Sequence, residues 1–225
     1  MHILLIHQVF VTPENGGGTR HFELAKFLVS YGHKVTVIAS DTDYLSNTKK
    51  KQSEEVIEGI HIKYAKTLSL LHKGILFRAI SFLSFSMSCI KLAFNTKHVD
   101  VVWGTSPPLF QSFSSLFIAK VKRVPFVFEV RDLWLDFAKQ LNVISNPFLI
   151  HFFKYLEKRL YKSADYLMVN SPGFIPFIKK IVPNKEVSLF PNGVISEEFS
   201  NLDPLIGKKI GSKIFNNNTL FKVLY

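Results

Sequence analysis

Residues 2–31 of the chain read HILLIHQVFVTPENGGGTRHFELAKFLVSY. The stretch opens with an apolar run at Ile3–Ile6, turns at Pro13–Gly18 and continues with apolar residues at helical spacing from Phe22 onward. A short apolar run bounded by turn residues indicates a buried strand, and the spacing that follows indicates a helix. The chain therefore starts with a strand, a glycine-rich turn and a helix, and the rest of the sequence repeats this alternation.

The glycine-rich turn is the first candidate binding site. Backbone N–H groups of Gly16, Gly17 and Gly18 lie beside the start of the helix, where partial positive charge suits a phosphate or sugar phosphate. A plain flexible turn explains the same three glycines. Their spacing matches neither a P-loop nor the dinucleotide-binding fingerprint, so a nicotinamide site is disfavoured. Arg20 and His21 follow the turn and face either the ligand or water.

Apolar runs and helical patterns alternate along the chain up to residue 190. We predict strands at His2–His7, Lys34–Ala39, Ile60–Ala65, Val99–Trp103, Phe126–Val130, Tyr166–Val169 and Val187–Phe190. We predict helices at Thr19–Tyr31, Leu76–Phe94, Pro107–Val121, Pro147–Lys162 and Ser171–Ile181, and an exposed loop at Asp41–Glu58. Continuous apolar strands that alternate with helices predict an α/β fold with a doubly wound parallel sheet, Rossmann-like, in which ligands bind beyond the carboxyl ends of the strands.

Composition limits the class of protein. The 225 residues are 47% hydrophobic and 20% charged, as in ordinary globular proteins, and the single cysteine, Cys89, allows no intrachain disulfide. The eight histidines show no metal-ligand spacing, so we expect no metal site. The net charge of +11 suits an anionic membrane face or nucleic acid, but the charge is dispersed and no aromatic–basic motif supports nucleic acid. The N-terminus resembles no secretory signal, which favours the cytosol.

Two predicted helices are relevant to the question of membrane binding. Gly74–Phe94 is apolar and about long enough to span one, but Arg78, Lys91 and four serines interrupt it. We expect it to cover the sheet, with a place in the membrane interface as the alternative. Pro147–Lys162 is amphipathic, and we expect Glu157 and Arg159 at its surface or on a face toward another domain. Its predicted apolar side consists of Phe148, Phe152, Phe153, Leu156 and Leu160, opposite Lys154, Lys158 and Lys162.

Two polar clusters follow predicted strands. The hydroxyl groups of Thr105 and Ser106 suit a ligand hydroxyl, and Ser106 is equally suited to cap the next helix. Residues 129–134 read EVRDLW and place two acids, an arginine and a tryptophan at a strand end. Charge is costly there unless it is paired, which favours a functional site. Arg131 suits a phosphate and Asp132 suits sugar hydroxyls or proton transfer, whereas a structural Arg–Asp pair closing the sheet is the alternative.

The pattern changes after residue 190. A polar, Lys/Asn-rich stretch leads to an apolar run at Leu220–Tyr225, which no helix follows. We predict one domain at residues 1–200, and at 201–225 a linker with the first strand of a second, missing domain. The alternative is an edge strand added to the same sheet.

These motifs, in this order, resemble the N-terminal domain of retaining, metal-independent glycosyltransferases with the GT-B fold, family four. The resemblance is strongest to bacterial enzymes of polysaccharide and O-antigen assembly, similar to fucosamine transferases, and it covers roughly residues 1–200. The residues that carry it are Gly16–Gly18, Tyr31–Val37, Thr105–Pro108, Glu129–Trp134, Glu157–Lys158, Ala164–Asp165, Asn170–Ser171 and Phe190–Val194.

The resemblance implies that two domains bind the two substrates separately. The N-terminal domain holds the acceptor, while a C-terminal domain, absent here, holds the nucleotide-sugar through a lysine, an arginine and paired glutamates. It implies catalytic roles for Asp132 and Arg131, and a place in the interdomain cleft for Asn192 and Gly193. It implies acceptor or phosphate binding by Gly16, Gly17, Gly18, Arg20, Thr105 and Ser106, with no cofactor and no metal. Many relatives have histidine where Arg131 stands, and many close relatives have proline where Leu135 stands.

We therefore expect the acceptor-binding half of a glycosyltransferase that moves a sugar from a nucleotide-sugar donor to a lipid-linked saccharide. The expected location is the cytoplasmic face of the plasma membrane, with anionic lipid as a partner and without nucleic acid. The chain alone is expected to be inactive, as a truncated gene product, an isolated domain or half of a split enzyme. The alternatives are a non-catalytic module that binds a partner or the membrane, and a nicotinamide-binding enzyme.

Overall fold

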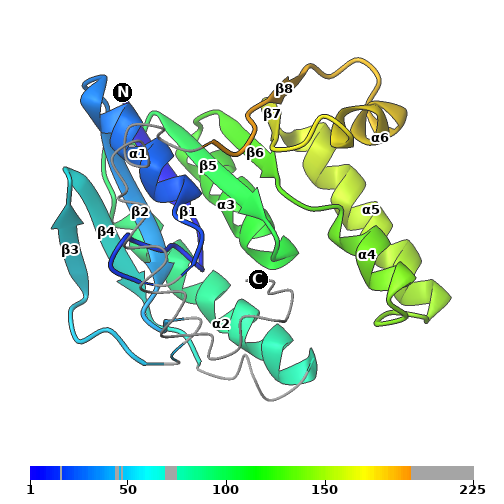
Figure 1. The fold of residues 1–225 in the computed structure, drawn as a ribbon, viewed down its shortest axis with the longest axis horizontal. Helices are drawn as coiled ribbons and strands as arrows, with labels where there is room; N and C mark the ends of the chain where they lie inside the picture. Colours follow the sequence, from blue (N-terminus) through cyan, green and yellow to red (C-terminus); the bar gives the residue numbers. More distant parts are fainter. Residues whose placement is uncertain (16, 44–45, 47, 69–74, 194–225) are drawn as a thin grey trace, which may run out of the picture. The chain divides into compact units, whose positions relative to one another are not determined.

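The sheet organises the chain. The computed structural model describes residues 1–15, 17–43, 46, 48–68 and 75–193, and its larger compact unit is Met1–Pro191. In these residues eight strands form one sheet in the order β3-β4-β2-β1-β5-β6-β7-β8 (Figure 1). Every neighbouring pair is parallel except β3 and β4. The predicted α/β, Rossmann-like fold is confirmed.

The element bounds are as follows. The strands are β1 (His2–Ile6), β2 (Lys34–Ser40), β3 (Glu54–Ile57), β4 (Ile60–Ala65), β5 (Val101–Ser106), β6 (Phe126–Val130), β7 (Tyr166–Val169) and β8 (Val187–Leu189). The helices are α1 (Arg20–Ser30), α2 (Ile75–Phe94), α3 (Leu109–Lys122), α4 (Trp134–Gln140), α5 (Pro147–Ser163) and α6 (Phe174–Ile181).

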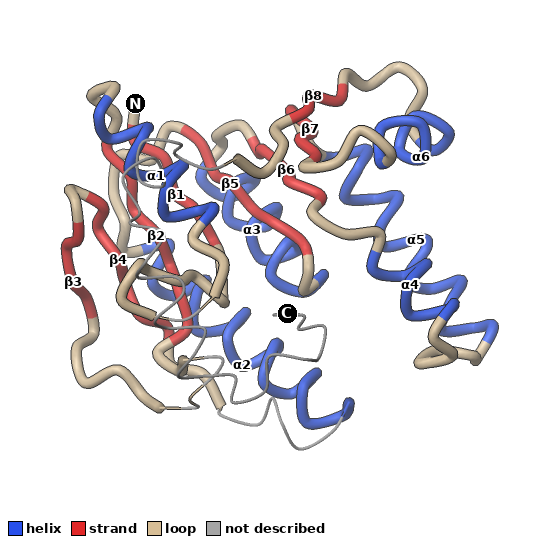
Figure 2. The backbone as a smooth tube through the Cα atoms, viewed as in Figure 1, coloured by secondary structure: helices blue, strands red, loops and turns tan. Residues whose placement is uncertain are grey.

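Helices cover the two faces of the sheet unequally (Figure 2). Successive residues of a strand point to opposite faces, so β1 contributes to both cores. Leu4 and Ile6 pack with residues of α2, α3, α5 and α6. Ile3 and Leu5 pack with residues of α1 on the other face. Because the central strand is buried on both sides, its carboxyl end is held firmly between the two layers.

The structure corrects several predicted boundaries. β3 lies inside the predicted loop at Asp41–Glu58 and pairs antiparallel with β4 through a two-residue turn. β5 runs on to Ser106, so Thr105 and Ser106 end a strand instead of following one. Pro108 stands at the N-cap of α3, so the alternative that Ser106 caps this helix was wrong. Gly173 stands at the N-cap of α6, two residues after the predicted helix start at Ser171. Sequence patterning missed α4 altogether.

The predicted apolar side of α5 was wrong at its N-terminal end. Phe148 and Phe152 are 86% and 52% exposed, whereas Leu160 is fully buried. The reason is that α5 packs on the sheet through its C-terminal half only, while its N-terminal half runs beside α4, beyond the sheet (Figure 1). For the same reason Glu157, expected at the surface, is buried at 9% exposure.

Helix α2 covers the sheet, as predicted. Phe85, Cys89 and Ala93 are buried in the core, and burial raises the pKa of the Cys89 thiol to about 12. The 18-residue window Phe77–Phe94 is also long and apolar enough to cross a membrane, with 28% of it buried. Core helices of soluble proteins meet the same criterion, so length and composition alone do not make it a membrane span.

The backbone of β5 passes very close to helix α3 at Gly104. A Cβ atom added to Gly104 would lie 2.5 Å from the Cβ and 2.6 Å from the Oγ of Ser115, and 3.0 Å from the ring of Phe126. Strand and helix must therefore separate if this residue gains a side chain.

We predict that Gly104→Ala lowers the free energy of unfolding by about 1–3 kcal/mol, because a methyl group overpacks this crossing. Urea denaturation measures the change. Gly18→Ala is the matched control, since nothing lies within 4 Å of a Cβ there. Equal effects of the two substitutions would contradict the packing assigned to this crossing.

Candidate functional site

The carboxyl edge of the sheet brings together polar residues from three neighbouring strands. His7 and Gln8 follow β1, Ser106 ends β5, and Arg131 and Asp132 follow β6. Their strands are parallel and adjacent, so these residues open on one edge. This edge is where open α/β sheets bind ligands.

A buried carboxylate organises this edge. Glu129, in β6, is 0% exposed. Its Oε1 accepts hydrogen bonds from Arg20 Nε at 3.1 Å and Nη2 at 2.9 Å, and its Oε2 accepts one from His21 Nε2 at 2.7 Å. Burial alone would raise the pKa of Glu129, but the hydrogen bonds from His21 and Arg20 and the positive charge of Arg20 outweigh it and lower the pKa to about 2. The carboxylate therefore stays ionised, and the stability it adds is lost only as pH falls toward 2.

Arg20 also binds the end of the compact unit. Its Nη1 donates to the carbonyl oxygen of Pro191 at 2.8 Å, and its Nη2 donates to that of Phe190 at 2.7 Å. One guanidinium thus joins the start of α1, the end of β6 and the segment after β8. The sequence suggested that Arg20 faces ligand or water, and the structure places it in this network.

Neutral histidine rings lie next to this network. The rings of His7 and His21 are 4.2 Å apart, and that of Trp103 is 5.5 Å from His21. Burial lowers the pKa of His7 well below its usual value. Burial also lowers the pKa of His21, against the opposing effect of Glu129. Both rings are therefore uncharged near neutral pH.

Several buried polar atoms here have no hydrogen-bond partner within the described ranges. They are both ring nitrogens of His7, both amide atoms of Gln8, Trp103 Nε1 and, after β7, Asn170 Oδ1. Unpaired buried polar groups are rare in folded proteins and mark places where water or a ligand completes the bonding. Sequence reasoning missed His7 and Gln8, although their position directly after the first strand was a signal.

Arg131 stabilises the adjacent strand ends. Its Nε donates to Thr105 Oγ1 at 2.8 Å and its Nη2 to the carbonyl oxygen of Pro107 at 3.0 Å. Burial lowers the pKa of Arg131, opposed by Glu129 and Asp132, and a guanidinium remains charged in any case. Among the described side chains no ion pair within 4.0 Å joins Arg131 to Asp132, so the alternative of a closing pair is not what the structure shows.

Asp132 is the exposed acid of the site. It opens to solvent on one side, and burial of the rest raises the pKa of its carboxyl group, with Arg131 opposing. On the inner side it lines a small cavity together with Ser106 and Glu157. Of the site residues predicted from the sequence, Arg131, Asp132, Thr105 and Ser106 therefore lie together.

The structure describes only some of the other site residues predicted from the sequence. Gly16 lies outside the described residues. Gly17 and Gly18 are exposed, and the backbone φ of +135° at Gly17 favours glycine there. Asn192 and Gly193 are exposed and belong to a second unit, so their place in an interdomain cleft stays a prediction.

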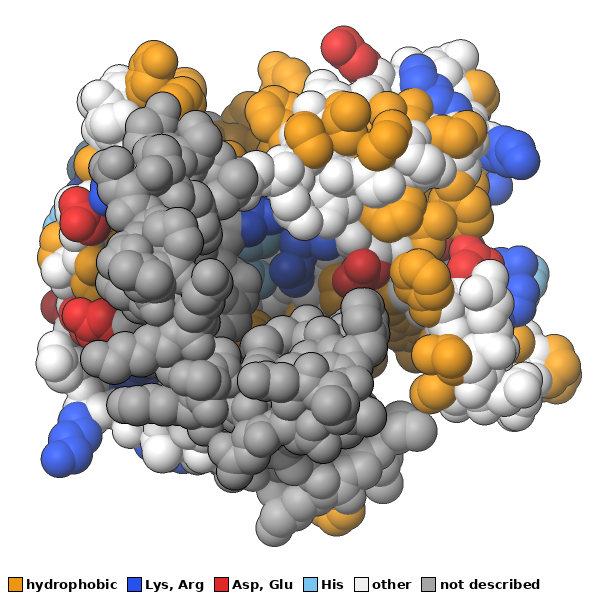
Figure 3. Space-filling view, in the orientation of Figure 1, with side chains coloured by type: hydrophobic (Ala, Val, Ile, Leu, Met, Phe, Trp, Pro, Cys, Tyr) orange, Lys and Arg blue, Asp and Glu red, His pale blue; other side chains and the backbone are white. Residues whose placement is uncertain are grey.

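Charged side chains gather near the centre of one face of the described residues. Figure 3 shows Lys or Arg and His side chains there, with an acidic side chain beside them. Among the described residues, no three or more His, Cys, Asp or Glu side chains form a group that could hold a metal ion. The carboxyl edge itself offers hydrogen-bonding groups and charge of both signs.

Solved structures share this fold. Sucrose-phosphate synthase from Thermosynechococcus elongatus aligns with a TM-score of 0.63 at 13% identity, over 86% of this chain and 48% of that one. HepE from Anabaena, in complex with UDP-glucose, aligns with a TM-score of 0.55 at 13% identity, over 95% and 50%. Os79 from O. sativa, in complex with UDP, aligns with a TM-score of 0.56 at 9% identity, over 92% and 56%. The chain thus spans about half the length of these structures.

No curated protein sequence matches the chain significantly. The model of one protein family, Glycosyltransferase Family 4, matches residues 15–198. That range runs from the glycine-rich turn through Asp132 and past the last strand of the sheet, and the architecture is that of the GT-B glycosyltransferases. The chain belongs to Glycosyltransferase Family 4.

Proposed function

We propose that this chain is the acceptor-binding half of a glycosyltransferase that moves a sugar from a nucleotide-sugar to a lipid-linked saccharide. The process would be bacterial surface polysaccharide synthesis, with fucosamine transferases as the nearest kind of enzyme. The observation that carries the proposal is the carboxyl edge, where unpaired buried polar atoms lie beside Arg131 and the exposed Asp132 in a family 4 chain. Two structural neighbours were solved with UDP-glucose or UDP, which supports a nucleotide-sugar as donor.

The chemistry proposed for this half is limited to a few groups. Asp132 orients an acceptor hydroxyl and takes up its proton, and Arg131 supplies positive charge near the donor phosphates. Transfer with retention and without a metal or other cofactor needs stabilisation of a leaving phosphate and an oxocarbenium-like centre. Most groups for that task belong to the donor-binding half, so we propose that residues 1–200 alone do not turn over, and that residues 201–225 lead into that half.

A non-catalytic module derived from such an enzyme is the second candidate. The observation that favours it is the exposed aromatic surface of α5, with Phe148, Phe152 and Tyr155, which suits a partner or a membrane. Mixing the chain with a separately expressed donor-binding half distinguishes the two candidate functions. Sugar transfer restored by mixing supports the enzyme, and absence of transfer supports the module.

We predict that Asp132→Ala, in the protein that carries both halves, lowers transfer at least about a hundredfold, the scale of a general base, while the fold survives. The measurement is incorporation of radiolabel from a panel of nucleotide-sugars into lipid extracts of bacterial membranes. Glu186→Ala, an exposed acid elsewhere, is the control. Unchanged transfer by the Asp132 variant would refute the role.

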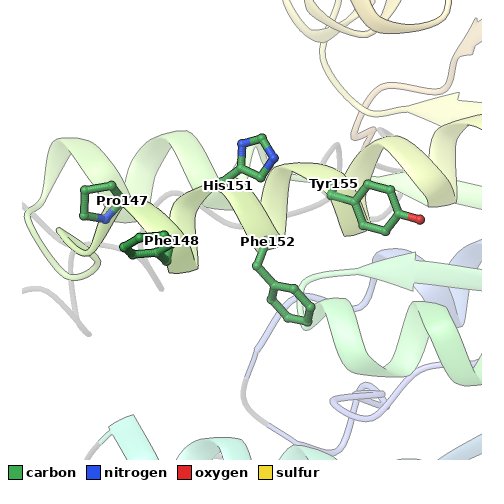
Figure 4. Close-up of a pocket in the computed structure, with 5 residues that line it drawn as sticks. All are labelled: Pro147, Phe148, His151, Phe152 and Tyr155. Carbon is green, nitrogen blue, oxygen red and sulfur yellow. The ribbon is translucent and has the colours of Figure 1, made fainter.

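We also propose that the chain docks on the inner face of the plasma membrane. The N-terminal half of α5 exposes Phe148, Phe152 and Tyr155, and these line an open hollow with Pro147 and His151 (Figure 4). The same helix carries the exposed lysines Lys154, Lys158 and Lys162. Apolar side chains enter the headgroup boundary, and each basic residue near an anionic surface adds about 1 kcal/mol.

We predict that the chain floats with vesicles containing phosphatidylglycerol at low salt and loses this binding as the salt concentration rises, because salt screens the attraction. The double change Phe148→Ser and Phe152→Ser should weaken flotation. Met87→Ser, in the exposed part of α2, is the matched control. Flotation that does not depend on salt would argue against the electrostatic contact. Loss of flotation in the Met87 variant alone would show that α2, not α5, contacts the membrane.

A further inference from the structure

Glu157 is a buried acid that the proposed chemistry leaves without a role. It lies in the C-terminal half of α5 beside the buried Leu160 and Tyr161. The side chain is 9% exposed, and within the described residues it forms no ion pair within 4.0 Å. A carboxyl group in such a place costs free energy that an apolar residue would not. Packing alone therefore does not account for an acid at this position.

The cavity next to Glu157 leads to the carboxyl edge of the sheet. Its polar lining consists of Glu157, Asp132 and Ser106, and its apolar walls are Leu109, Trp134, Leu135 and Phe153. Its volume is about 10 Å³, close to the space that one water molecule needs. Two acidic residues, one after β6 and one in α5, thus line the same small cavity.

The surroundings keep Glu157 protonated below about pH 7. Burial raises the pKa of its carboxyl group to about 7, and the Asp136 carboxylate of α4 adds to the rise. The Tyr161 hydroxyl and Lys154, both on α5, act in the opposite direction. With Asp132 across the cavity, the charged or titratable neighbours are two acids, one lysine and one tyrosine. A protonated carboxyl group there is a hydrogen-bond donor as well as an acceptor.

We propose that Glu157 is a positioning residue for Asp132: its protonated carboxyl group donates a hydrogen bond across the cavity, directly or through one water molecule, and so orients the Asp132 carboxylate at the sheet edge. This proposal rests on the proposed function for its purpose. The coupling between the two carboxyl groups, however, can be measured whether or not the protein transfers sugars.

The sign of the pH dependence follows from the order in which the two groups titrate. Asp132 loses its proton first, while Glu157 is still neutral and donates to it. As pH rises through about 7, Glu157 ionises, the donated hydrogen bond is lost and a second negative charge faces Asp132. The positioning is therefore present below that pH and lost above it.

Carbon NMR of the chain labelled with ¹³C at the aspartate carboxyl carbons tests this. Asp132→Asn assigns the resonance. We expect the Asp132 signal to show its own titration and a second step near pH 7 that reports Glu157. In Glu157→Gln, whose amide still donates, the second step should vanish and the first should stay in place. In Glu157→Leu, which has no donor, the pKa of Asp132 should rise by about one unit.

Asp165 provides an internal control for the fold. It accepts a hydrogen bond from the Phe126 backbone N–H at 2.8 Å, at the opposite edge of the sheet. The carboxyl ¹³C chemical shift of Asp165 should follow the same pH dependence in the wild type and in all variants. Unchanged backbone spectra should confirm that each variant folds. A wild-type Asp132 signal without a step near pH 7, or a step that survives in Glu157→Gln, would overturn the proposal. Full transfer by Asp132→Ala would refute the proposed catalytic role instead, so the two failures are distinguishable.

Discussion

A single buried carboxylate, Glu129, determines how the candidate site is built. An ionised carboxylate without contact to water costs several kcal/mol unless charge and hydrogen bonds compensate it. Both partners that compensate it, Arg20 and His21, come from the first turn of α1, directly after the glycine-rich turn. The pairing therefore fixes the helix that follows β1 against the end of β6. The glycine-rich turn and the Arg131–Asp132 segment open on the same edge as a result.

The same arginine extends this constraint to the end of the compact unit. Because Arg20 binds the carbonyl oxygens of Phe190 and Pro191, the segment after β8 is tied to the carboxyl edge of the sheet. Next to it, Arg131 binds Thr105 and Pro107, so the two arginines hold the ends of β5 and β6. Asp132 is left with one exposed side and one side on the cavity. This arrangement suits the role proposed for Asp132.

Local patterning predicted most of the sheet because its central strands are buried on both faces. The limits of β1, β2, β4, β6 and β7 were predicted within one residue. β3 was missed because an edge strand with alternating exposure, Glu54–Ile57, reads as polar loop. The sequence pointed to Arg131 and Asp132 through the charged cluster after β6. The sequence could not show that Glu129 pairs with residues more than a hundred positions earlier. It also could not show that only the C-terminal half of α5 packs on the sheet and buries Glu157, because both features depend on tertiary packing.

The central claim is that the Arg20–Glu129 pair assembles the carboxyl edge, and a double-mutant cycle tests it most directly. Urea denaturation of the wild type, Arg20→Met, Glu129→Gln and the double variant gives the coupling free energy of the two side chains. We predict a coupling of about 2–3 kcal/mol, because Arg20→Met leaves the buried Glu129 carboxylate with His21 as its remaining partner and without a compensating positive charge. Effects that add within about 0.5 kcal/mol would contradict it.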